Sequence, residues 1–99
     1  MNFTESYPRL YQFFGGYFPD ADLEKLTDEE VVANYIVDCN KSVVSTLELE
    51  NVKKDILILM DDIELYWEDV MDIANRHFHN SNEALEWLNM IKNELNKIR

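Results

Sequence analysis

Carboxylate side chains are the most numerous reactive groups in this sequence, and their densest group lies between residues 61 and 72. Asp61, Glu64, Glu68 and Asp72 are spaced three, four and four residues apart, and Asp69 lies beside them. Residues at this spacing share one face of an α-helix. Like charges on one helix face repel each other, and Lys or Arg side chains of a partner would relieve the repulsion. This pattern predicts a partner-binding face; an ordinary solvated face is the alternative.

A second group of acids lies where we expect a loop to lead into a helix. Its members are Asp20, Asp22, Glu24, Asp28 and Glu29. The first three faintly resemble a calcium-binding loop, but the central glycine and the final glutamate of an EF-hand are missing. Loops held by a rigid scaffold often carry function. We therefore expect this cluster to be the second contact region for a partner.

The other reactive side chains form no catalytic or metal-binding pattern. Cys39 is the only cysteine and falls at the expected end of a helix, where the helix dipole raises the pKa of a thiol. His77 and His79 are two residues apart and would point away from each other on a helix, and zinc would need further ligands. We expect no cofactor, no metal and no enzymatic activity.

The charge of the chain restricts its partners. Twenty acidic residues and nine basic residues give a net charge of −11. This charge disfavours nucleic-acid phosphates and anionic membranes and favours a basic partner, although solubility alone also explains it. The excess of acids lies in residues 1–75, whereas residues 76–99 are nearly neutral.

Length and composition predict one ordered domain over residues 1–99. The chain is 46% hydrophobic and contains only two Gly and two Pro, so most of it should be regular structure. A single cysteine allows no internal disulfide, which fits a reducing compartment. No apolar run approaches the roughly 18 residues that span a membrane, and the first residues do not resemble a signal peptide. We expect a cytoplasmic protein.

Apolar periodicity and capping residues predict the first two helices. One should begin at Pro8, and Gly15-Gly16 should end it or allow a close approach, before a turn over residues 19–22. Thr27 and Glu30 form a capping box, which predicts a helix over residues 28–39.

The rest of the chain also follows helical periodicity. Residues 42–60 are mostly helical in pattern, with a β-branched start that leaves a strand as the alternative. Asp61 is the expected N-cap of a new helix whose apolar stripe runs over residues 63–77, although one helix over 52–77 is also possible. A polar break at 80–83 precedes a last helix with an apolar stripe up to Ile98. Together these elements predict an all-α, compact, single-domain bundle of four to six helices.

Two segments resemble a known family. The run Tyr7-Pro8-Arg9-Leu10-Tyr11-Gln12-Phe13-Phe14-Gly15-Gly16-Tyr17-Phe18, followed by Asp20 and Asp22, resembles the opening of a family of contact-dependent growth inhibition (CDI) immunity proteins. Glu83-Ala84-Leu85-Glu86-Trp87-Leu88 resembles the family's last helix. The family often continues with His-Gln-Asp-Trp where Pro19-Asp20-Ala21-Asp22 stands here, so no role of that tryptophan is transferred.

The resemblance implies a specific function. Such proteins are cytosolic and neutralise the C-terminal toxin domain of their cognate CDI effector, commonly by covering its active site. Many of these toxins are nucleases with basic clefts, where carboxylates of the inhibitor can replace substrate phosphates. We expect a monomer in a 1:1 complex with such a toxin, and no direct binding of nucleic acid or membrane. An acidic interaction adaptor or nucleic-acid mimic is the alternative.

Overall fold

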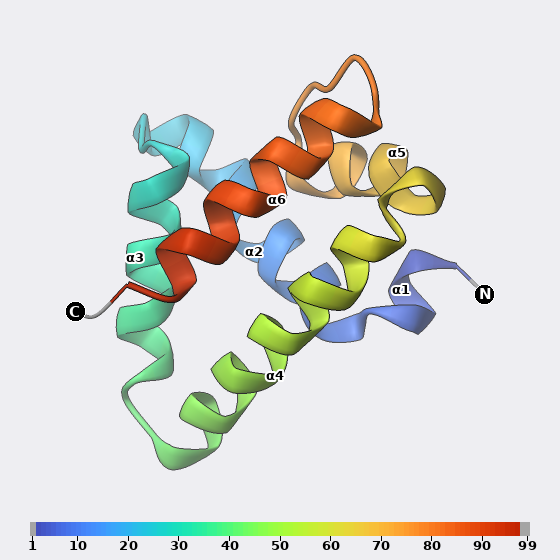
Figure 1. Cartoon of the computed structure of the whole chain (residues 1–99). Helices are drawn as coiled ribbons and strands as arrows, with labels where there is room; N and C mark the ends of the chain where they lie inside the picture. The colour runs from blue at the N-terminus through green and yellow to red at the C-terminus, as the bar shows by residue number, and fades with distance from the viewer. Residues whose placement is uncertain (1, 98–99) are drawn as a thin grey trace.

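Two helices, α2 and α6, lie on opposite sides of the core and are held there by the same three neighbours. The computed structural model describes residues 2–97 and contains no strand in that range. Its helices are α1 (Phe3–Ser6), α2 (Pro8–Glu24), α3 (Asp28–Cys39), α4 (Val43–Asp61), α5 (Ile63–Ala74) and α6 (Ser81–Leu95). Both α2 and α6 pack against α3, α4 and α5 (Figure 1). The predicted all-α bundle is confirmed.

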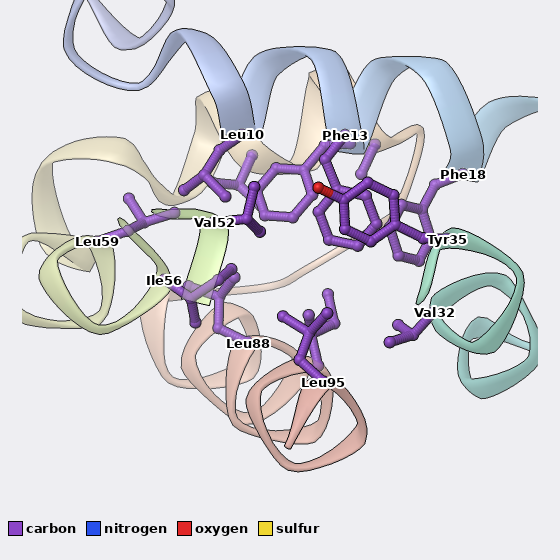
Figure 2. Packing of buried hydrophobic residues seen from close by; sticks show 14 of the residues in the cluster. Leu10, Phe13, Phe18, Val32, Tyr35, Val52, Ile56, Leu59, Leu88 and Leu95 are labelled. Atoms are coloured by element: carbon purple, nitrogen blue, oxygen red, sulfur yellow. The ribbon is translucent and has the colours of Figure 1, made fainter. Parts of the chain in front are cut away.

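The core is one continuous cluster of apolar side chains between these helices. Figure 2 shows Leu10 and Phe13 of α2 facing Leu88 of α6 across it, with α3 and α4 at its sides. The rings of Phe13 and Tyr35 stack with centroids 4.1 Å apart, and Phe14 and Trp87 pack with centroids 5.3 Å apart. The Cα radius of gyration, 12.7 Å, is close to the about 13 Å of a compact domain of this length.

The second half of α2 contradicts the prediction for residues 15–22. The glycine pair does not end the helix, and Pro19 lies inside it instead of starting a turn. The helix ends at Glu24, and Lys25 takes a left-handed conformation with a φ of 59°. Burial of Phe18 and Ala21 against the core outweighs the poor helix propensity of Gly and Pro.

The next two helices agree with their sequence signals. In α3, the Thr27 side chain accepts a hydrogen bond from the Glu30 amide, and the Glu30 carboxylate accepts one from the Thr27 amide. Ser42 caps α4, whose helical start excludes the strand considered for this region. Both helices are therefore fixed at their first turn by local hydrogen bonds.

The pair of aspartates separates α4 from α5, as predicted, but the cap differs. Asp61 is the last residue of α4, and Asp62 is the residue between the helices. The side chain of Asp62 makes no capping bond and instead accepts a hydrogen bond from Tyr7 Oη at 3.0 Å. The helix α5 ends at Ala74, so His77 lies beyond it and is exposed.

The last helix begins at the predicted polar break. Asn80 is its N-cap and accepts a hydrogen bond from the Glu83 amide at 3.0 Å. The buried residues Ala84, Leu88 and Ile91 lie on its core-facing side. The predicted stripe ends at Ile98, which lies outside the described residues. No helix among residues 2–97 is long and apolar enough to cross a membrane.

Candidate partner-binding surfaces

The acidic face of α5 is fully presented on the surface. Glu64, Glu68, Asp69 and Asp72 are all exposed. Glu64 accepts a hydrogen bond from Ser81 Oγ at 2.6 Å. Within residues 2–97, the side chains of Glu68, Asp69 and Asp72 have no hydrogen bond or ion pair. These three side chains are therefore free to contact a partner, on a helix held in place by α2 and α6.

Asp61 does not belong to the same helix face. It is exposed but terminates α4, whereas the other four acids lie on α5. The spacing puts Asp61 on the same face as the other acids only if one helix contains all of residues 61–72. Asp62 separates α4 from α5, so Asp61 lies on a different helix.

The second acidic cluster is split into two sets by an internal cation. Asp22 and Asp28 both bind Arg76, at 3.2 Å and 2.7 Å. Asp28 also accepts a hydrogen bond from Trp87 Nε1 at 2.7 Å. These two carboxylates thus connect α2 and α3 to α6 and to the loop after α5, and the single positive charge of Arg76 offsets part of their negative charge.

Arg76 itself is held by more than its two ion pairs. Its guanidinium lies over the Phe18 ring, 5.4 Å from the centroid, and donates to the carbonyl oxygens of Ala74 and Asn75. Burial by itself would lower the pKa of Arg76, but the hydrogen bonds and charges of Asp28 and Asp22 outweigh it and raise that pKa. The side chain is 15% exposed, so this arrangement is structural.

The other members of the second cluster remain available to a partner. Asp20, Glu24 and Glu29 are exposed, and their side chains have no hydrogen bond or ion pair within the described part of the chain. Asp20 and Glu24 lie one turn apart on α2, and Glu29 is in the first turn of α3. The cluster therefore provides three free carboxylates instead of five.

A groove between α2 and α3 passes beside Asp20 and Glu24, and the sequence did not indicate it. It encloses about 380 Å³ and is lined by Gly16, Asp20, Ala21, Glu24, Val31 and Asp38, among others. At one side, Tyr17 Oη donates a hydrogen bond to Asp38 at 2.7 Å. Burial and this hydrogen bond raise the pKa of Tyr17 to about 12, so the hydroxyl stays protonated at neutral pH.

The cysteine is buried in the protein, whereas both histidines are exposed to solvent. Cys39 is buried, and burial is the main cause that raises the pKa of its thiol. His77 and His79 are exposed and pack their rings edge to face, with centroids 4.8 Å apart. Among residues 2–97, no three His, Cys, Asp or Glu side chains are positioned to hold a metal ion.

Several apolar side chains also reach the surface near the α3–α4 connection. Val37, Val43, Val44 and Leu47 are between 58% and 78% exposed. Apolar periodicity did not predict this exposure, because α4 contains Val43, Val44 and Leu47 together with the buried residues Leu49, Val52, Ile56 and Leu59.

No protein-family model, curated protein or solved structure matches this sequence. The function is therefore inferred from the residues and their geometry.

Proposed function

We propose that this chain is an immunity protein that binds and neutralises the C-terminal toxin domain of a CDI effector. The observation that carries the proposal is the group Glu68, Asp69 and Asp72. These are three exposed carboxylates that have no side-chain partner within residues 2–97, in a chain of net charge −11. The resemblance of residues 7–20 and 83–88 to CDI immunity proteins supports the choice of partner.

The proposed mechanism is occlusion of a basic active site. Carboxylates on α5 pair with Lys and Arg side chains that would otherwise bind substrate phosphates, and the body of the bundle then covers the site. The long-range field of an acidic protein also accelerates its encounter with a basic partner. A monomer acts in a 1:1 complex in the cytoplasm of the cell that it protects.

The two acidic surfaces differ in how closely their free carboxylates are grouped and in whether neighbouring acids hold the fold together. On α5, three carboxylates lie within five residues of one helix. In the second cluster, Asp22 and Asp28 are held by Arg76, and replacing them would disturb the fold as well as any interface. The α5 face is therefore the primary contact, and Asp20, Glu24 and Glu29 form the secondary contact.

Two matched charge reversals test this function. One variant replaces Glu68, Asp69 and Asp72 with Lys, and the other replaces Asp20, Glu24 and Glu29 with Lys. Both change the net charge from −11 to −5, and both avoid the Arg76 contacts. We expect the α5 variant to lose protection of cells that express the toxin domain, with at least about a hundredfold weaker Kd. The second variant should lose less.

Each result has a clear meaning for the proposal. Equal losses in both variants would show that total charge matters and would reject the α5 face. The immunity function predicts that a CDI effector is encoded beside the gene of this chain. Absence of such an effector, or absence of binding between its toxin domain and the wild-type protein, would reject that function. Binding to several unrelated basic proteins, with steep salt dependence, would favour the acidic adaptor or nucleic-acid mimic, because a cognate inhibitor discriminates sharply.

A further inference from the structure

Gly16 is a helix-interior glycine that the fold does not require. Neither glycine has a positive φ, so backbone conformation does not demand this residue type. A Cβ at Gly16 would meet no atom within 4 Å, so packing does not demand it either. Glycine nevertheless weakens a helix interior relative to alanine.

The neighbouring Gly15 differs, because it faces another helix. A Cβ there would lie 3.5 Å from Ile73 Cγ2 of α5, which is an ordinary van der Waals contact that alanine can make. The Gly15 carbonyl also stands four residues before Pro19, which has no N–H to donate and whose ring crowds that position in a helix. The two adjacent glycines therefore form a natural pair for comparison.

Gly16 lines the α2–α3 groove, and it also borders a second hollow lined by Gly15 and Ile73. The lining of the α2–α3 groove includes the apolar side chains of Leu26, which is partly buried, and Val37, which is 58% exposed. Two free carboxylates, Asp20 and Glu24, stand along its α2 side at a spacing of four residues. Like charges at this spacing repel each other, so a cation bound between them would remove an unfavourable interaction.

Apolar side chains that line the same groove as two carboxylates fit a long basic side chain. The methylene groups of Lys or Arg can cover apolar surface while the charged end reaches carboxylates. Arginine fits better than lysine, because its planar guanidinium has five donors and can serve two carboxylates at once, whereas an ammonium is a point charge.

We propose that the α2–α3 groove is an anchor site for an arginine side chain of a basic protein partner, and that the absence of a side chain at Gly16 keeps it open. This inference rests on the proposed function for the identity of the partner. It adds that the second acidic surface binds by insertion of a side chain, whereas the α5 face offers exposed carboxylates along one helix.

A short peptide tests the groove independently of any toxin. The probe is acetyl-Gly-Arg-Gly-amide, titrated into the full chain while amide NMR shifts are recorded, with Lys and norleucine versions as controls. We expect shifts centred on Gly16, Ala21 and Glu24, with a Kd on the order of millimolar. The Lys peptide should bind more weakly, and the norleucine peptide should produce no localised shifts.

Variants at the glycine pair provide the matched control. Gly16→Gln should weaken binding of the Arg peptide about fivefold or more while leaving Tm at or above that of the wild type. Gly15→Ala should leave peptide binding unchanged. Asp20→Asn with Glu24→Gln should abolish the localised shifts.

The outcomes separate the two proposals. Shifts spread over all acidic surfaces, or unchanged peptide binding in folded Gly16→Gln, would overturn the groove site even if the toxin domain binds. Localised shifts that Gly16→Gln removes would support the site even if no toxin domain binds, and only the immunity function would then fail.

Discussion

At the scale of single residues, Arg76 determines which acids of the second cluster can meet a partner. The sequence places Asp22 and Asp28 in the same acidic group as Asp20, Glu24 and Glu29, and nothing local distinguishes them. Arg76 lies more than 45 residues away in the chain yet binds both, and Trp87 also donates to Asp28. No spacing rule finds such a contact, because it depends on where the loop after α5 lies.

Replacing Arg76 tests this role. Arg76→Met keeps most of the side-chain volume but leaves Asp28 without its cation, so we expect a loss of about 2–3 kcal/mol in the free energy of unfolding. Arg9→Met is the control. Its ion pairs with Glu48 and Asp55 are more exposed, and its loss should stay below about 1 kcal/mol. Urea unfolding followed by circular dichroism measures both, and equal losses would contradict a structural role for Arg76.

At the scale of elements, the local sequence correctly predicts where α3 begins but does not predict where α2 ends. The capping box of Thr27 and Glu30 predicts the start of α3, because both of its hydrogen bonds lie within four residues. In α2, local chemistry predicts either an end or a close approach of a neighbour at Gly15-Gly16, and the helix continues past this pair for another eight residues to Glu24. Packing of Phe18 and Ala21 against the core stabilises this part of the helix and compensates for the low helix propensity of its Gly and Pro residues.

The capping box allows a prediction with a defined pH dependence. Thr27→Ala should lower the free energy of unfolding by about 1 kcal/mol at pH 7. Hydrogen bonds from the Thr27 backbone and side chain lower the pKa of Glu30 in the folded protein. A lowered folded pKa means that ionised Glu30 adds stability above its unfolded pKa, and that this stability is lost as pH falls through the folded pKa.

Glu30→Gln removes the negative charge from the capping box and keeps a side chain of nearly the same shape. The stability difference between wild type and Glu30→Gln should be present at pH 7 and should disappear in strongly acidic solution. The matched control is Glu29→Gln in the same turn, because Glu29 makes no side-chain hydrogen bond among residues 2–97 and should show a smaller change. A Glu30 difference that persists unchanged at low pH would contradict the assignment.

At the scale of the whole molecule, repulsion between the excess negative charges lowers the free energy of unfolding. Twenty acids share a bundle with principal extents of 35, 29 and 21 Å, so many like charges lie within about a few Debye lengths of each other. Arg76 offsets one of the two charges of Asp22 and Asp28, and Arg9, Lys41, Lys53 and Lys97 offset others through their own ion pairs. The free acids of α5 and of the groove are thus tolerated at some cost in stability, which is consistent with the binding role that we propose for them.

Salt should therefore stabilise the free protein. Raising NaCl from 0.05 to 0.5 M screens repulsion between exposed acids, and we expect Tm to rise by about 2–5 °C. The variant with Lys at positions 68, 69 and 72 has a net charge of −5 and should respond less. Differential scanning calorimetry measures both proteins, and a Tm that falls with salt would show that screened ion pairs outweigh the repulsion.

The sequence by itself determined the features that depend on neighbouring residues and on composition. These are the helical class, the start of α3 and the acidic character of the chain. Short-range hydrogen bonds and periodic apolar positions are sufficient for them, because both are encoded within one or two helical turns.

Only the tertiary structure decided the continuation of α2 through Gly15, Gly16 and Pro19, the groove beside Gly16, and the pairing of Arg76 with Asp22 and Asp28. Each depends on contacts between segments far apart in the chain. The free energy that selects these contacts comes from the packed core as a whole, and a window of sequence around any one residue does not contain it.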